Sequence, residues 1–217
     1  RRRQRQMCIR DSSSRLPVAE QVKNASSLFE RFPNHLHTFL LKPETADQKY
    51  LTEAIKTVIE TPHLLAPFSF VGITEKELGN TTLERMHGVA QLRIALDRAD
   101  IHAPLHVFGA LDPLTCVLFF LAGAEVFDGL TWLRYAFHDG LCVYARNYGA
   151  LNVGTDQRDS RVQARILTDN VHYLQRLSAQ MRKYLLDRDF SQFEHHESFI
   201  SSAVSYTHLR AHETATY

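Results

Sequence analysis

Apolar and polar positions along the chain follow two periods, one typical of strands and one typical of helices. Four short apolar runs have the length and composition of buried strands, at 36–41, 68–73, 105–108 and 125–127. The stretches around them carry apolar residues at helical spacing and predict helices over 18–32, about 47–60, about 82–98 and 112–122. The pattern therefore predicts alternating strands and helices.

Residues that start and stop helices agree with these boundaries. Asn80, Thr81 and Thr82 offer N-caps, and Glu84 follows in the first turn of the helix that runs to about residue 98. Asp112 precedes a proline that opens the next helix. Strand-then-helix units of this kind predict parallel strands with helices outside.

The predicted fold class is α/β, as the C-terminal half of a (β/α)8 TIM barrel with a C-terminal helical extension. The partial barrel spans 13–154, and the extension spans 155–203 with an amphipathic helix or helical pair over 161–187. A complete barrel takes about 250 residues. We therefore expect at least about 100 further residues upstream to complete it.

Both ends of the chain differ from the middle. Residues 1–12 and 204–217 resemble translated sequencing-adapter sequence and are excluded from the fold. The alternative for the first is a basic arm that binds nucleic acid. Six of the 25 Lys and Arg residues and two of the 24 Asp and Glu residues lie in these ends, which leaves a net charge of −3 between them. Nucleic-acid binding would then need a local basic patch.

Composition excludes several classes of protein. No apolar run approaches the roughly 18 residues that a membrane helix needs, so we expect no membrane association. The three cysteines, Cys8, Cys116 and Cys142, form no CxxC pair and indicate neither a disulfide framework nor a thiolate metal site. These features favour a cytoplasmic setting.

In a parallel barrel, reactive groups lie at the C-terminal ends of the strands, where the following loops converge. His35 and His37 form an HxH pair, but they precede the apolar part of their strand and are interpreted as structural. The residues at the productive ends lie at 42–44, 72–77, 108–112 and 127–129, and several are carboxylates and glycines.

Three strings at these ends carry a resemblance to a known family. They are VGITEKE at 71–77, HVFGALDP at 106–113 and LAGAEVFDG at 121–129. Together they resemble the queuine/archaeosine tRNA-guanine transglycosylases, TIM-barrel enzymes in which a strand-end aspartate is the covalent nucleophile. The resemblance covers roughly 36–193. It implies exchange of guanine for a 7-deazaguanine base in nucleic acid.

The resemblance assigns a role to each matching residue. Asp128 takes the place of the nucleophile, and a carboxylate there can add to C1′ of the sugar opposite the leaving base. The positions implied to bind substrate are Gly72 and Ile73 through their backbone, Glu77, Phe108 against the base, Gly109, and Arg134 toward the nucleic acid. Gly129 is expected to leave room for the sugar. The residues alone favour a different role for Asp128, as the N-cap of a helix that begins near Thr131, and the resemblance shifts the preference to the nucleophile.

The chain also departs from the family pattern. Typical members hold zinc with three cysteines and a histidine, whereas the matching stretch here is Thr168, Asp169 and Asn170 and no cysteine follows Cys142. No metal or other cofactor is therefore expected. In the family, the general base and the aspartate that reads guanine belong to strands earlier than those seen here. The family also has a glutamine after the strand that corresponds to 36–41, and in this chain Lys42 or Glu44 takes its place.

The substrate branch follows from the same comparison. The string FDGLTWLRYAF, the HVFG motif and the missing zinc ligands resemble the bacterial and phage branch that inserts 7-deazaguanines such as preQ0 into DNA, so DNA is favoured over tRNA. Two alternatives stay open: a barrel glycosidase or hydrolase of another family, and a non-catalytic nucleic-acid-binding homologue. The sequence does not indicate an oligomeric state.

Overall fold

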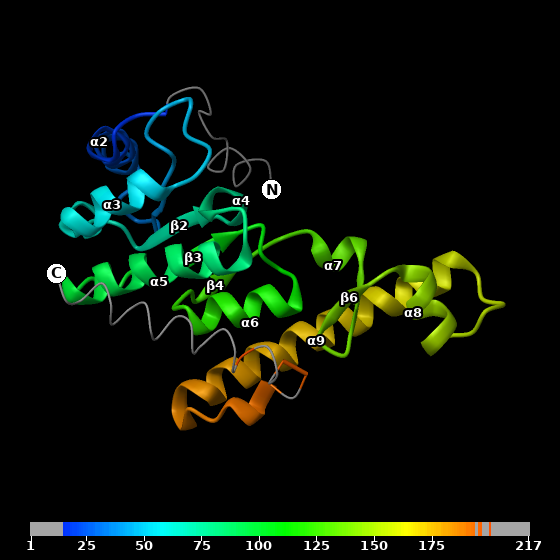
Figure 1. The fold of residues 1–217 in the computed structure, drawn as a ribbon. Helices are drawn as coiled ribbons and strands as arrows, with labels where there is room; N and C mark the ends of the chain where they lie inside the picture. Colours follow the sequence, from blue (N-terminus) through cyan, green and yellow to red (C-terminus); the bar gives the residue numbers. More distant parts are fainter. Residues whose placement is uncertain (1–14, 194, 197–199, 201–217) are drawn as a thin grey trace.

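The computed structural model describes residues 15–193, 195, 196 and 200, and the adapter-like ends at 1–12 and 204–217 lie outside the described residues. The fold is mixed α/β (Figure 1). Its strands are β1 (Thr38–Leu40), β2 (Phe70–Thr74), β3 (Leu105–Phe108), β4 (Val126–Phe127), β5 (Ala136–His138) and β6 (Leu141–Val143). Its helices are α2 (Val18–Phe29), α3 (Thr52–Glu60), η1 (Pro62–Leu65), α4 (Glu75–Leu78), α5 (Thr82–Arg98), α6 (Pro113–Leu121), α7 (Thr131–Arg134), α8 (Ala145–Asn152), α9 (Asp159–Asp187) and η2 (Phe190–Phe193).

Strands β1 to β4 form one parallel sheet in the order in which they occur along the chain. The register aligns Gly72 with Leu40 and His106, and it aligns Phe108 with Thr74. All four strands were predicted, each within two residues of its observed ends. The parallel sheet confirms the α/β class and brings the C-terminal ends of the strands to a common edge.

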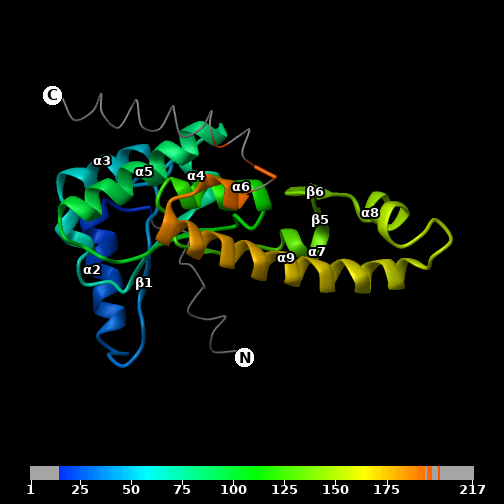
Figure 2. The same ribbon diagram turned by 90° about the horizontal axis from the view of Figure 1, so that it is seen from below.

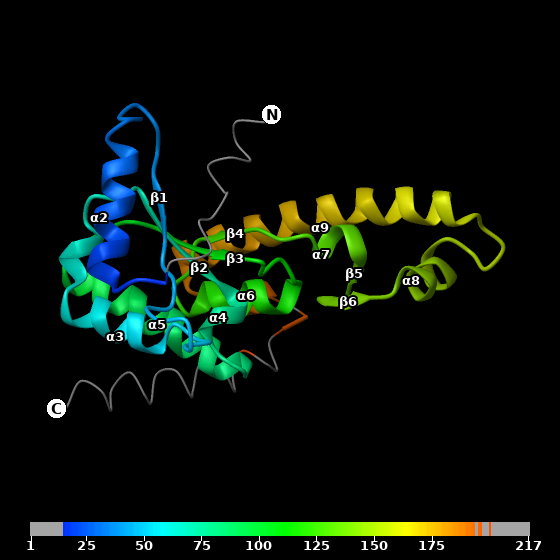
Figure 3. The same cartoon turned by 90° about the horizontal axis from the view of Figure 1, so that it is seen from above.

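Helices cover one face of this sheet. Helices α3, α5 and α6 lie next to one another along it, each between two consecutive strands in the chain (Figure 3). The predicted caps are present: Thr81 and Glu84 form a capping box at the start of α5, and Asp112 accepts the backbone N–H groups of Leu114 and Thr115 at the start of α6. Local sequence signals therefore set these helix starts.

The two faces of the sheet differ in burial. Side chains beneath the helices are fully buried or nearly so, and they form the main core with the helices: Phe39, Leu41, Val71, Ile73, Leu105 and Val107. Alternate residues point to the opposite face and stay partly exposed, among them Thr38, Leu40, Phe70, Thr74, His106 and Phe108. We call this second surface the open face. It is the face on which the candidate site lies.

The segment after β4 forms a second region that contacts α9 (Figure 2). Strands β5 and β6 pair as an antiparallel hairpin, joined by a turn in which Asp139 and Gly140 have φ angles of 45° and 80°. This hairpin and α8 were not predicted, although Asp-Gly between apolar residues is a strong hairpin signal. Helix α9 runs from α8 to α6 and joins this region to the sheet.

Two sequence predictions about helices need correction. The helix predicted over about 47–60 begins later than expected, because α3 starts at Thr52. Gln48 lies in a loop instead, where its side chain accepts the N–H groups of Glu44 and Thr45. The amphipathic helix predicted over 161–187 is α9, but the apolar residues along it are not all on the packed side. Its buried residues are Val162, Ile166, Asn170, Tyr173 and Leu177, whereas Leu186 is 88% exposed.

A search of the described residues finds no helix that is both long enough and apolar enough to cross a membrane.

Candidate functional site

The loop after β3 holds the carboxylate that follows β4. Asp128 comes directly after the last residue of β4, and its Oδ1 accepts the backbone N–H of Gly109 at 2.9 Å. Gly109 has a φ of 85°, a left-handed conformation that costs glycine little. The side chain of Asp128 is 50% exposed. The carboxylate is thus oriented by a backbone donor and still accessible.

His106 faces the other oxygen of this carboxylate, and the sequence analysis did not identify it. Its Nε2 lies 3.6 Å from Asp128 Oδ2, and its ring stacks on Phe108 with the centroids 3.8 Å apart. Burial lowers the pKa of His106, and the nearby charge of Asp128 partly offsets this effect. The sequence could have indicated that His106 lies next to Phe108, because residues two apart on a strand share a face.

Phe108 lies over Gly72 on the open face. A Cβ built on Gly72 would meet the Phe108 ring at 2.7 Å, with side-chain atoms of Thr38 and Leu40 at 3.3 and 3.4 Å. Only glycine leaves the ring in this position. Ile73 belongs to the opposite face, where its side chain is fully buried, so any contact it makes with a ligand at this edge is through its backbone.

The two glycines of the site differ in the space around them. No atom lies within 4 Å of a Cβ built on Gly109, whereas one built on Gly129 would lie 3.0 Å from Cβ of Leu111. Gly129 therefore permits close packing of the loop. The room that the sequence analysis expected beside Gly129 lies at Gly109 instead.

Glu77 lies in α4, the short helix that follows β2, and it forms an ion pair. Lys42 donates to its carboxylate at 2.6 Å and to the hydroxyl of Thr74 at 2.9 Å, and both charged side chains are about one-fifth exposed. The pair links the ends of β1 and β2. Arg134, the other charged residue predicted to contact substrate, lies exposed on α7.

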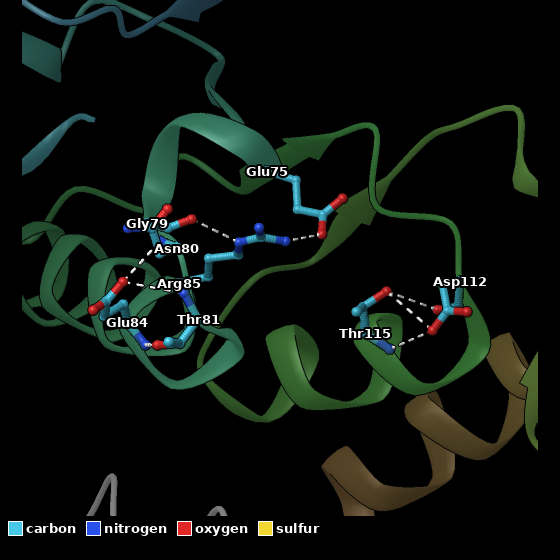
Figure 4. Close-up of polar contacts among 8 residues, drawn as sticks. All are labelled: Glu75, Gly79, Asn80, Thr81, Glu84, Arg85, Asp112 and Thr115. Carbon is cyan, nitrogen blue, oxygen red and sulfur yellow. Dashed lines mark hydrogen bonds and ion pairs between the residues drawn. The ribbon is translucent and has the colours of Figure 1, made fainter. Parts of the chain in front are cut away.

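Other carboxylates near the strand ends have structural partners. Glu75 forms an ion pair with Arg85 at 2.6 Å, and Asp112 caps α6 (Figure 4). Glu44, after β1, accepts the N–H of Val18 and the hydroxyl of Thr57. Asp128 differs from them because its carboxylate contacts a single backbone donor and a histidine across 3.6 Å.

The alternative role for Asp128 as a helix cap is not supported. The N-cap of α7 is Leu130, and no side chain makes a capping hydrogen bond there. The carboxylate points instead to the loop after β3. Asp128 therefore does not stabilise the start of α7, and the helix-capping interpretation is wrong.

Residues 168–170, which the sequence resemblance places at a zinc site, lie in α9 and connect this helix with the hairpin. Buried Asn170 accepts the N–H of Phe137 at 2.8 Å and donates to the carbonyls of Trp132 and Tyr135 at 2.7 and 2.8 Å. Asp169 accepts from Tyr148 and Arg165. Both polar residues are satisfied by protein partners, and the donor set contains too few thiolates for a structural zinc.

The HxH pair lies before β1, at the N-terminal edge of the sheet. His37 stacks on Phe29 with centroids 4.4 Å apart, and its Nε2 contacts the carbonyl of Phe32 at 2.9 Å. His35 is exposed. Across the described residues, no three His, Cys, Asp or Glu side chains cluster in a way that could hold a metal ion.

No protein-family model matches the chain, and neither does any curated protein or solved structure.

Proposed function

We propose that this protein is a base-exchange transglycosylase that replaces guanine with a 7-deazaguanine base in nucleic acid, with Asp128 as the covalent nucleophile. The proposal rests on the exposure and the hydrogen bonding of the Asp128 carboxylate. It is half-exposed at a strand end, held by the Gly109 N–H at 2.9 Å, and without a helix to cap. Neighbouring carboxylates are occupied by ion pairs and caps.

The reaction needs two displacements at one carbon. In the first, an oxygen of Asp128 forms a bond to C1′ as the bond from C1′ to N9 of guanine breaks, and guanine leaves with a proton at N9 supplied by a general acid. In the second, the incoming base loses that proton equivalent, attacks C1′ and releases the carboxylate. The two inversions give net retention, and no oxidant or metal is required.

The open face offers a place for a flat base. The Phe108 ring fills the space above Gly72 and is itself partly exposed, so a purine that reaches this edge of the sheet can pack against an aromatic ring. The Lys42–Glu77 pair forms a polar wall nearby, because Lys42 also contacts Thr74, which aligns with Phe108 in the sheet. Its charged groups can bind the polar edge of the base.

The barrel itself is part of the proposal. The open face carries apolar side chains, including Leu40, Phe70 and Phe108, that are only partly covered. In a (β/α)8 barrel the same face lies inside and is filled by side chains from the remaining strands. We propose that further strands of the full-length protein cover this face and supply the general acid–base group and the guanine-reading residue.

The proposed substrate is DNA in preference to tRNA, and the proposed incoming base is of the preQ0 type, in a cytoplasmic protein. The target nucleotide would have to leave its stack to reach Asp128. Because the residues between the adapter-like ends carry a net charge of −3, phosphate contacts must be local. Arg134, exposed on α7 six residues after the nucleophile, is the proposed contact.

We propose that this enzyme works without the structural zinc of related enzymes. Asp169 and Asn170 use their polar atoms in hydrogen bonds that connect α9 with its neighbours, and cysteine ligands are lacking in this stretch. Metal analysis of the purified protein after dialysis should find substoichiometric zinc. One zinc per chain after dialysis would contradict this part of the proposal.

The substitution Asp128→Asn tests the proposed nucleophile. It keeps the shape of the side chain and removes the attacking charge, so exchange of labelled guanine by the full-length protein should fall by at least about a thousandfold. Asp100→Asn is the matched control, because Asp100 is exposed and distant in the fold. If Asp128→Asn retained exchange in both DNA and tRNA, the mechanism would be wrong.

A further inference from the structure

The ring nitrogen Nε2 of His106 is a buried polar atom that forms no hydrogen bond within the described part of the chain. It is inaccessible to solvent. The side chain is 17% exposed, and the ring is fixed by its stack on Phe108, at 3.8 Å between centroids and 25° between planes. A buried donor or acceptor left without a partner destabilises the folded state, so this nitrogen is a candidate for a contact that forms in the working site.

The unpaired nitrogen faces the proposed nucleophile. Asp128 Oδ2 lies 3.6 Å from Nε2, while Oδ1 accepts the Gly109 N–H at 2.9 Å. The distance to Oδ2 exceeds that of a hydrogen bond by roughly 0.5 Å, and such contacts often shorten when substrate binds. The two donors, one in β3 and one directly after it, then face the two oxygens and define the plane of the carboxylate.

We propose that His106 is a positioning residue for Asp128, in which the neutral imidazole donates its Nε2–H to Oδ2 while the Gly109 amide holds Oδ1. This inference rests on the proposed function for its catalytic consequence. During attack, one carboxylate oxygen bonds to C1′ and the other becomes the carbonyl oxygen of the sugar ester, which keeps its hydrogen bond. No proton moves at His106 in either displacement.

The electrostatics agree with a neutral imidazole. Burial favours the uncharged form and lowers the pKa of His106, and the Asp128 carboxylate opposes this shift. Asp128 is the charged group that acts on His106 among the described residues. Phe108, on the other side of the ring, carries no charge. Neutral imidazole has a single N–H, so the proposal requires that this proton be on Nε2.

Nuclear magnetic resonance of the 217-residue chain tests the contact without any activity. In the wild-type chain, nitrogen shifts should report the Nε2–H tautomer of His106. In Asp128→Asn, the pKa of His106 should fall further, by about half a pH unit or more, because the opposing charge is removed. A backbone amide spectrum checks that each variant is folded.

A second histidine–carboxylate pair provides the matched control. His102 Nε2 lies 3.2 Å from Asp100, but the two side chains are 83% and 93% exposed, so solvent screens the pair. Asp100 has a φ of 57°, which asparagine tolerates well, so Asp100→Asn should leave the fold intact. The ring resonances of His102 should therefore respond less to Asp100→Asn than those of His106 respond to Asp128→Asn. Equal responses, or a His106 pKa unchanged by Asp128→Asn, would overturn the proposed contact.

Kinetics of the full-length protein test the consequence. His106→Phe keeps an aromatic ring against Phe108 but lacks the donor, so kcat should fall about 10- to 100-fold with KM nearly unchanged. His106→Gln carries an amide donor and should recover part of the loss. A wild-type kcat in His106→Phe would overturn the positioning role while leaving Asp128 as nucleophile. Exchange by Asp128→Asn would instead refute the proposed function, and the resonance experiment would still decide the contact.

Discussion

The two faces of the parallel sheet show how one set of strands serves two purposes. On the helix-covered face, Val71, Ile73 and Val107 are completely buried in an apolar core. On the open face, His106 lies beside the half-exposed carboxylate of Asp128, and Gly72 lies under the Phe108 ring. The covered face provides stability, and the open face presents polar groups whose geometry that stability fixes. The chemistry proposed for Asp128 would therefore depend on the core on the opposite face of the sheet.

The largest expected difference between the faces concerns stability. Ile73→Ala should lower the free energy of unfolding of the 217-residue chain by about 3 kcal/mol, because it leaves a cavity in the core. Leu40→Ala, on the open face, should cost about 1 kcal/mol because that side chain is already partly exposed. Urea unfolding of both variants measures the difference.

The same pair tests whether a barrel closes over the open face. In the full-length protein, further strands would bury Leu40, and the cost of Leu40→Ala should rise toward that of Ile73→Ala. An unchanged cost of Leu40→Ala in the full-length protein would show that this face stays uncovered, and the barrel proposal would be wrong.

A smaller loss of stability is expected from a substitution at Gly72, which tests how closely the Phe108 ring packs on the backbone. A methyl group there would lie 2.7 Å from the Phe108 ring, so Gly72→Ala should displace the ring and cost roughly 1–2 kcal/mol. Gly109→Ala is the control, because it strains a φ of 85° without meeting any atom within 4 Å. Proton shifts of Phe108 and His106 should change in the first variant and much less in the second. Unchanged ring shifts in Gly72→Ala would contradict the close packing described here.

Local signals account for most of what the sequence predicted correctly. Apolar runs located β1 to β4, and Thr81 with Glu84 and Asp112 located two helix starts, because these features depend on neighbours within four residues. The position of Asp128 at a strand end was predictable for the same reason. Its contact with Gly109 was not, because that contact joins loops 19 residues apart.

The region around α9 was harder to predict because long-range polar contacts organise it. Asn170 interrupts the apolar pattern of α9, yet it is the buried residue that binds the backbone of Trp132, Tyr135 and Phe137. A periodicity argument assigns polar residues to the solvent side and so misplaces the buried stripe. The role of His106 was missed for a related reason: its significance arises only when the register brings β3 and β4 together.

The most direct test of the account is to identify the atom that bonds to the sugar. The full-length protein would be mixed with an end-labelled, guanine-containing DNA oligonucleotide, quenched with denaturant and digested, and the peptides analysed by mass spectrometry. The account predicts a covalent adduct on the peptide that contains Asp128, and its loss in Asp128→Asn. An adduct on a different carboxylate, or base exchange that proceeds in Asp128→Asn, would contradict it.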